Sequence, residues 1–280
     1  MMKFSLLCFF LLVGLPAAEI TEGYAAASGA HLWFQDTQGK GTPVVLLHAA
    51  SGNAAMWESQ MRSFSQAGYR VIVWDRRGHG KTTTEPDVSA STAVEDMARI
   101  LEKLNVRRFH LVGTAAGGIV ALDFALSFQD RLISLTVANS IYGIEDPSYL
   151  EIRSNLRAAS AKASGMRTDF LELGPSYRAM NPEGVARWLS GTKQNPSVRI
   201  PQPTRNKITF AAIQGLRIPV LLITGDGDLL SPPPLIRLVH AKIPQSEMLV
   251  VPESGHSAFW EQPEMFNRTV LSFIARHSPR

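Results

Sequence analysis

The chain has 280 residues, of which 45% are hydrophobic and 19% are charged, and its formal net charge is +4. This length and composition exclude a disordered or fibrous chain and favour a globular protein with one substantial core, for which a single α/β domain is the default expectation. The segment from Ile141 to Phe210 has ten basic and six acidic residues, a surplus equal to the charge of the whole chain, and no basic run is interleaved with aromatic residues, so nothing favours nucleic-acid binding.

The N-terminus, MMKFSLLCFFLLVGLPAAE, has one lysine, an apolar run from Phe4 to Leu15, and small residues at Ala17 and Ala18. This pattern is typical of a secretory signal, and the run is too short for the ~20 residues that cross a membrane. We expect residues 1–18 to be a signal peptide, cleaved after Ala18 or as late as about residue 27, and the protein to be secreted or periplasmic without stable membrane association. An uncleaved N-terminal anchor is the alternative. Cleavage would remove Cys8, the only cysteine, and leave no disulfide.

Short apolar runs alternate with segments of helical spacing along the rest of the chain. The runs predict strands buried on both faces, as parallel strands are, at Val44–His48, Arg70–Trp74, Phe109–Val112, Leu132–Ala138, Val220–Thr224 and Met248–Val251. The helical spacing predicts helices at Ala54–Gln66, Ser91–Leu104, Gly117–Ser127, Pro233–Lys242 and Pro263–Arg276. This alternation predicts a doubly wound, mostly parallel sheet, with an additional strand at His31–Phe34 on its antiparallel edge.

The alternation stops between Ser140 and Ile213. Helical pieces occur there at Tyr149–Lys162 and Glu183–Ser190, but no convincing strand does, and the proline-rich segment Asn195–Asn206 has the composition of a loop. An insertion above the strand ends where ligands bind would act as a cap. We therefore predict a core at residues 28–139 and 214–280 and a helical cap at 140–213.

The stretch LVGTAAGGIVAL, from Leu111 to Leu122, joins a predicted strand to a helix rich in small residues. It has the frame of the G-x-S-x-G nucleophile elbow, a sharp turn that projects its central side chain into a cleft. Gly113 and Gly117 would permit close backbone packing there. The central position is Ala115, which has no hydroxyl group.

Two further segments supply residues suited to acyl transfer, which needs a base and an acid that orients it. Asp226 and Asp228 follow the predicted strand at Val220–Thr224, and His256 lies between the last strand and the last helix. The order elbow, aspartate, histidine is the one that this chemistry takes on an α/β sheet. Either aspartate could instead be a turn residue beside a glycine, and His256 could be an ordinary loop histidine.

Together with the elbow, four further motifs in register make the chain resemble the α/β-hydrolase superfamily, in particular its small capped esterases, lactonases and C–C hydrolases, from about Trp33 to Arg276. LLHAASGNAAMW resembles the family's LLHG-x-x-G-x-x-x-W segment, with Ala49 where glycine is usual, and DRRGHGKT resembles D-x-R-G-H-G-x-S. TGDGD resembles the G-x-x-D block, and SGHSAFWEQPEMF resembles the closing G-H-x-x-x-x-E-x-P-E block.

The resemblance implies an α/β-hydrolase fold with a helical cap inserted late in the sheet. It puts the acid at Asp228 rather than Asp226, the base at His256 and the nucleophile position at Ala115. It also implies that the oxyanion would be bound by the backbone N–H groups of Ala50 and Ala116, each contributing about 3 kcal/mol in the transition state.

Several other residues have a structural and a functional interpretation. Trp57, Tyr142, Trp188, Phe259 and Trp260 are candidates for apolar walls of a substrate site, and core packing explains each of them equally well. His48 and His79 belong to the matched blocks, where we expect them to organise loops. We expect His31, His110, His240 and His277 to lie at the surface or at strand ends. No H-x-H, H-E-x-x-H or C-x-x-C motif occurs, so we expect no metal or other cofactor.

A methyl group cannot attack a carbonyl, and loss of the nucleophile in a comparable protease costs about 10⁶ in turnover. Our interpretation is a serine hydrolase with an acyl-enzyme mechanism in which Ala115 replaces serine by design, giving a nearly inactive form that traps its substrate. The first alternative is a natural pseudoenzyme that binds a ligand on a hydrolase scaffold. The second is a histidine and aspartate pair that performs base chemistry without covalent catalysis.

We expect the substrate to be a small or medium carboxylic ester or lactone with an apolar part. The basic segment gives a slight indication of an acidic or polar group on it. A C–C hydrolase is the remaining alternative, although such enzymes usually act on cytosolic compounds, and the predicted export signal argues against it.

Overall fold

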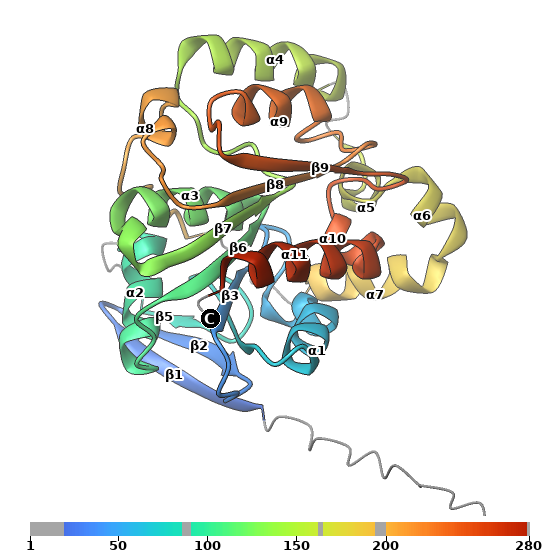
Figure 1. Ribbon diagram of the computed structural model, residues 1–280. Coiled ribbons are helices and arrows are strands. Elements are labelled where there is room, and N and C mark those ends of the chain that lie inside the picture. The colour runs from blue at the N-terminus through green and yellow to red at the C-terminus, as the bar shows by residue number, and fades with distance from the viewer. Residues whose placement is uncertain (1–19, 86–90, 162–164, 194–199, 279–280) are drawn as a thin grey trace, which may run out of the picture.

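A mostly parallel nine-stranded sheet forms the centre of the computed structural model, which describes residues 20–85, 91–161, 165–193 and 200–278 (Figure 1). The strand order is β1-β2-β4-β3-β6-β7-β8-β9, with β5 paired to β2. All pairings from β4 to β9 are parallel, and those of β2 with β1, β4 and β5 are antiparallel. The predicted doubly wound, mostly parallel sheet is confirmed.

The strands are β1 (Thr21–Ala27), β2 (Ala30–Asp36), β3 (Pro43–Leu47), β4 (Arg70–Trp74), β5 (Thr83–Thr84), β6 (Phe109–Thr114), β7 (Leu132–Ala138), β8 (Val220–Gly225) and β9 (Ser246–Val251). Every residue of β6, β7 and β8 is buried, because these central strands are covered on both faces. This explains why their sequences are continuous apolar runs without alternation.

Helices cover both faces of the sheet (Figure 1). On one face, α1 (Glu58–Gln66), preceded by the 3₁₀ helix η1 (Ala54–Trp57), and α11 (Pro263–His277) pack Phe64, Phe266 and Phe273 into one core cluster. On the other face, α2 (Ala93–Lys103), α3 (Ala116–Phe128) and α9 (Pro233–His240) contribute Val94, Phe124 and Leu235 to a second cluster. The short elements η2 (Gln129–Arg131) and α10 (Ala258–Glu261) precede β7 and α11.

The N-terminal edge of the sheet differs from the prediction. The strand expected at His31–Phe34 is β2, but it is not at the edge, because β1 pairs with it along its whole length. The core therefore begins before residue 28. The leader predicted for residues 1–18 lies outside the described residues, whereas cleavage as late as residue 27 would remove β1.

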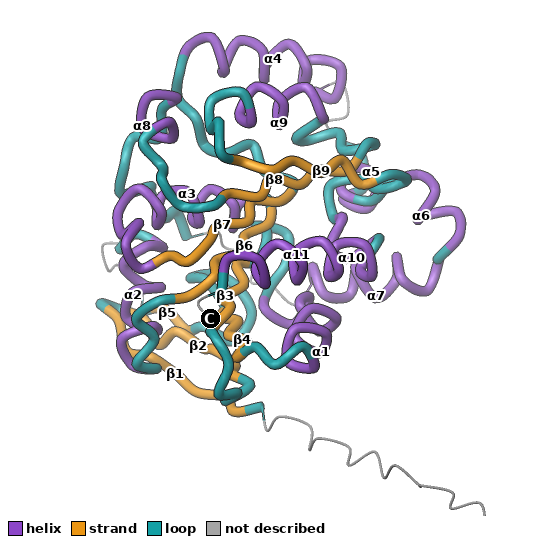
Figure 2. The backbone as a smooth tube through the Cα atoms, viewed as in Figure 1, coloured by secondary structure: helices purple, strands orange, loops and turns teal. Residues whose placement is uncertain are grey.

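The segment between β7 and β8 contains helices and loops but no strand among its described residues (Figure 2). Its helices are α4 (Pro147–Ala161), α5 (Thr168–Glu172), α6 (Pro175–Met180), α7 (Pro182–Lys193) and α8 (Phe210–Gln214). The helical pieces expected at Tyr149–Lys162 and Glu183–Ser190 correspond to α4 and α7, and α5, α6 and α8 were not anticipated. We refer to residues 140–213 as the cap segment. Helix α8 ends one residue after the predicted end of this segment.

The chain changes direction across the sheet between β3 and β6. From β3 it moves outward to β4, and β6 then pairs on the opposite side of β3, with Leu47 next to Gly113. The loops that follow two such strands diverge and leave a crevice at the carboxyl edge of the sheet, where ligands of α/β proteins bind. This topology brings the loop after β3 and the turn after β6 to the same place.

Candidate active site

The turn after β6 holds Ala115 in a backbone conformation that alanine rarely adopts, with φ 50° and ψ −115°. Three hydrogen bonds fix it: its N–H donates to Ala138 O at 2.9 Å, and its carbonyl accepts from Gly118 N at 3.0 Å and from Ser140 Oγ at 2.8 Å. Such strained residues persist where the surrounding structure determines them, and they cluster at functional sites. The backbone geometry is that of a nucleophile elbow, although the side chain of Ala115 has no nucleophilic group.

Two glycines make this turn sterically possible. A Cβ atom on Gly113 would lie 2.4 Å from the carbonyl oxygen of Gly117, and one on Gly117 would lie 2.3 Å from that of Leu47. The helix α3 can therefore approach the ends of β3 and β6 closely only without these side chains.

His256 and Asp228 form a buried pair beside this turn. The ring Nδ1 of His256 lies 2.9 Å from both carboxylate oxygens of Asp228. Asp228 also accepts hydrogen bonds from Leu230 N, the N–H and hydroxyl of Ser231, and Asn139 Nδ2, at 2.7 to 3.0 Å. These donors hold the carboxylate of Asp228 as an anion. Nδ1 of His256 therefore carries a proton and donates a hydrogen bond to this carboxylate.

The electrostatics of the pair follow from this geometry. Burial disfavours the charged ring of His256, but the negative charge of Asp228 and its hydrogen bond outweigh this effect and raise the pKa of His256 above its ordinary value of 6.5. Burial likewise opposes ionisation of Asp228, yet His256, Ser231 and Asn139 hold the pKa of that carboxyl well below its ordinary value. Asp226 has a different role, because it accepts from the backbone N–H groups of Glu253 and Ser254 and stabilises a turn.

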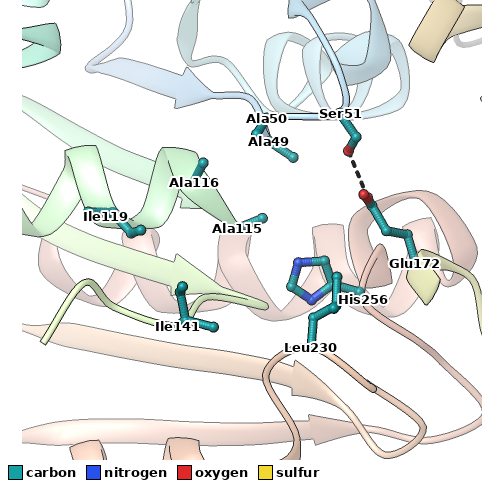
Figure 3. A pocket seen from close by; sticks show the side chains of 10 residues that line it. All are labelled: Ala49, Ala50, Ser51, Ala115, Ala116, Ile119, Ile141, Glu172, Leu230 and His256. Carbon is teal, nitrogen blue, oxygen red and sulfur yellow. Dashed lines mark hydrogen bonds between the residues drawn. The ribbon is translucent and has the colours of Figure 1, made fainter. Parts of the chain in front are cut away.

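A cavity of about 360 Å³ joins the elbow to His256 (Figure 3). The methyl group of Ala115 faces the ring of His256, and the ring nitrogen that does not contact Asp228 is directed toward Ala115 (Figure 3). The residues that line the cavity are Ala49, Ala50, Ser51, Ala115, Ala116, Ile119, Ile141, Glu172, Leu230 and His256. A reacting group at position 115 would therefore be beside a base.

Ala50 and Ala116 line the same cavity from the loop after β3 and from the start of α3. The N–H of Ala116 lies in the first helical turn, where amides have no partner within the helix. The backbone at Ala50 is oriented by His48, whose Nε2 accepts from Arg76 N at 3.0 Å, so that Nδ1 carries the proton and donates to Ala49 O at 2.7 Å. Because the peptide is planar, this bond also fixes the direction of the Ala50 N–H.

The five aromatic residues named as candidate substrate contacts do not line the cavity. Trp57 and Phe259 pack against each other in the core cluster beneath α1 and α11, with ring centroids 4.5 Å apart and ring planes tilted by 39°, and Trp188 belongs to the same cluster. Tyr142 is buried in the cluster on the other face of the sheet. Core packing, the alternative considered for each, describes the positions of these four residues. Trp260 is half-buried against the same cluster as Trp57.

Six cavity residues were not predicted as site residues: Ala49, Ser51, Ile119, Ile141, Leu230 and Glu172. Helical spacing would have indicated Ile119, which lies one turn after Ala115 on α3. No local signal indicates Glu172, which comes from the cap segment and accepts a hydrogen bond from Ser51 Oγ at 2.7 Å (Figure 3). No lysine or arginine of the basic segment lines the cavity, where Glu172 and His256 are the ionisable residues among those that do.

The other histidines are mostly structural. His79 contacts the carbonyl oxygen of Ala50 at 3.1 Å through Nε2, and so helps to organise the loop after β3, as predicted. His110 lies at the start of β6, as expected of a strand-end residue, but it is fully buried, contacts Ser134 Oγ at 2.7 Å, and burial lowers its pKa to about 4. Within the described residues, no group of three His, Cys, Asp or Glu side chains could hold a metal ion, and no helix is long and apolar enough to span a bilayer.

Comparison with known proteins places these features in a family context. A family model described as the alpha/beta hydrolase fold matches residues 42–263. RutD of Azorhizobium caulinodans, a proposed carbamate hydrolase, is 28% identical over 265 residues, covering 89% of this chain and 97% of RutD. The 2-hydroxy-6-oxononadienedioate/2-hydroxy-6-oxononatrienedioate hydrolase of Burkholderia vietnamiensis is 27% identical, covering 87% and 90%. A thermophilic esterase of Thermogutta terrifontis superposes with a TM-score of 0.72 at 24% identity, covering 93% and 100%.

Proposed function

The chain belongs to the alpha/beta hydrolase fold family, and on this premise we propose that its site binds a carboxylic ester or lactone in the arrangement for attack from position 115. In this proposal His256 is the general base, Asp228 orients it, and the N–H groups of Ala50 and Ala116 stabilise the oxyanion. One observation carries the proposal: the strained elbow residue, the base and the oxyanion loop all border one cavity.

The chemical step that this arrangement serves is acyl transfer. A hydroxyl at position 115 would lose its proton to Nε2 of His256 as its oxygen bonds to the substrate carbonyl carbon, and the carbonyl electrons would move to the oxygen held by the two N–H groups. Collapse would expel the alcohol, which takes the proton back from His256, and water would release the acid. Alanine cannot begin this sequence, so we propose that the chain with Ala115 holds its substrate without cleaving it.

The size and lining of the cavity support a small substrate with an apolar part. Ile119, Ile141 and Leu230 are the apolar side chains that would contact its hydrocarbon portion. The relatives include a proposed carbamate hydrolase and a hydrolase of 2-hydroxy-6-oxo dienedioates, so carbamates and C–C substrates belong in the same assay series. The ester or lactone is the choice that the proposed acyl-enzyme favours.

A second candidate is hydrolysis in which water replaces the missing hydroxyl. It is favoured by the free nitrogen of His256, which is directed toward the methyl group of Ala115 (Figure 3). A water molecule there could lose its proton to His256 and attack a carbonyl polarised by the same N–H groups. This mechanism needs no residue at position 115 other than a small one.

The experiment is the substitution Ala115→Ser, assayed with short aryl esters, lactones and carbamates. Trapping by the Ala115 form predicts a gain approaching 10⁶-fold, with substrate binding to both forms by calorimetry. Ile119→Thr is the matched control, because it adds a hydroxyl to the same cavity one helical turn beyond position 115 and should give no gain. Binding without a gain would indicate a pseudoenzyme. Turnover already present with Ala115, and lost in His256→Ala, would indicate the water mechanism.

A further inference from the structure

Glu261, at the end of α10, is a buried carboxylate that the reaction proposed above does not use. Its side chain accepts backbone hydrogen bonds from Gly255 at 2.9 Å, Ser257 at 3.1 Å and Gly174 at 2.6 Å. Gly255 and Ser257 are the two neighbours of His256 in the chain, whereas Gly174 joins α5 to α6 in the cap segment. One carboxylate therefore connects the segment Gly255–Ser257, which we call the His256 loop, to the cap segment.

The two backbones that Glu261 connects are in direct contact. A Cβ atom on Gly255 would lie 2.5 Å from Gly174 N, and one on Gly174 would lie 2.9 Å both from Gly255 N and from the carboxylate of Glu261. Side chains at either position would force the cap segment and the His256 loop apart. The absence of side chains at these two glycines and the position of the carboxylate are thus parts of one junction.

The charge of Glu261 suits this role. Glu261 is 5% exposed, and burial raises the pKa of its carboxyl group, so the charged form needs strong hydrogen-bond donors. The three N–H groups are the donors, and each would lose its acceptor if the carboxylate were removed. The junction also sets a wall of the cavity, because Glu172 lies two residues before Gly174 and lines it.

We infer that Glu261 is a positioning residue that holds the His256 loop and the α5–α6 junction of the cap segment in one fixed arrangement, so that the base and the cavity wall cannot move independently. The inference rests on the proposed function in one respect, namely that His256 is the base. The structural coupling itself does not require turnover.

Asp123 provides a matched control. It is also a buried carboxylate, on α3, and it also accepts hydrogen bonds from backbone N–H groups of the cap segment, those of Arg205 at 2.7 Å and Asn206 at 2.9 Å, which lie between α7 and α8. Among the described residues, Asp123 has no hydrogen bond to the His256 loop. Loss of its charge should loosen the exit of the cap segment without reaching His256.

The test uses the protein with Ala115 and two readouts. The first is the low-field proton resonance of the His256 Nδ1–H, which depends on the bond to Asp228 and is assigned by its loss in Asp228→Asn. The second is amide hydrogen exchange at Gly174, Gly255 and Ser257. Glu261→Gln should broaden or shift the resonance and accelerate exchange at these amides by about tenfold or more. Asp123→Asn should leave the resonance unchanged and accelerate exchange only around Arg205 and Asn206.

An unchanged resonance and unchanged exchange in Glu261→Gln would overturn the inference, as would an equal disturbance of the resonance by Asp123→Asn. If Glu261→Gln does not fold, Gly174→Ala tests the same junction from the cap side and should disturb the same resonance; an unperturbed resonance there would also overturn it. Neither readout needs catalysis, so failure of Ala115→Ser to gain activity would contradict the proposed function and leave this inference standing.

Discussion

The Nδ1 atom of His256 lies 2.9 Å from both carboxylate oxygens of Asp228, and this contact follows from the pairing of two strands. Asp228 comes shortly after β8 and His256 shortly after β9, and these strands are parallel neighbours with Gly225 next to Val251. Parallel strands end at the same edge of a sheet, so the two loops meet there. The contact gives rise to the first two predictions.

Removal of the Asp228 charge should reduce catalysis far more than binding. In the Ala115→Ser background, we expect Asp228→Asn to lower kcat by about 10³ to 10⁴-fold, because the ring loses the partner that fixes its tautomer and stabilises its cation. KM should change little, since Asp228 does not line the cavity. Steady-state kinetics on an aryl ester measure both values. Asp226→Asn is the control, and a loss of kcat equal to that of Asp228→Asn would contradict the assignment of the acid.

The pH dependence of activity should follow the ring of His256. The neutral ring is the base, and Asp228 raises its pKa above 6.5, so kcat/KM should rise with pH and reach half its plateau above pH 6.5. In Asp228→Asn, burial remains without the opposing charge, and the midpoint should move to lower pH. A pH–rate profile of both proteins provides the measurement. A midpoint that stays in place or moves upward in Asp228→Asn would show that another group titrates.

The sequence predicts the central sheet and the order of its chemistry, because buried parallel strands are continuous apolar runs and the motifs follow them directly. It does not predict which apolar side chains face the site. Trp57 and Trp188 are as hydrophobic as Ile141, and only the direction of each side chain separates a core residue from a cavity residue. Glu261 itself belongs to the G-H-x-x-x-x-E-x-P-E block, but its contact with Gly174 joins residues 87 positions apart along the chain, and no local pattern indicates that contact.

The ion pair between Arg77 and Asp96 should stabilise the loop after β4. Asp96 accepts two hydrogen bonds from the Arg77 guanidinium at 2.7 and 2.9 Å and one from Gln202 at 2.7 Å, and both charged side chains are almost completely buried. Asp96→Asn should lower the free energy of unfolding by about 3 to 5 kcal/mol, because it leaves the arginine charge uncompensated. Urea denaturation measures the change.

The control for this prediction is Glu58, whose ion pair with Arg62 is largely exposed on α1. Glu58→Gln should change the free energy of unfolding by no more than about 0.5 kcal/mol, since water screens such pairs. If both substitutions destabilise the protein equally, the buried pair has no special role.

The boundary of the mature protein should lie before β1. The strand pairs with β2 from Thr21 to Ala27, and Glu22 accepts a hydrogen bond from the indole N–H of Trp33 at 3.1 Å. Sequence alone allows cleavage as late as residue 27, because the small residues Ala25 to Ala27 resemble a cleavage site. In the structure these three alanines belong to β1, and Ala25 is buried. We therefore propose export with cleavage after Ala18.

A chain that begins at Ile20 should match the exported protein in its urea midpoint. A chain that begins at Ser28 should unfold at a lower urea concentration, because β2 loses its partner β1 and becomes the edge strand of the sheet. The mass of the exported protein gives the cleavage site directly, and a mature N-terminus at or beyond Ala25 would refute this boundary.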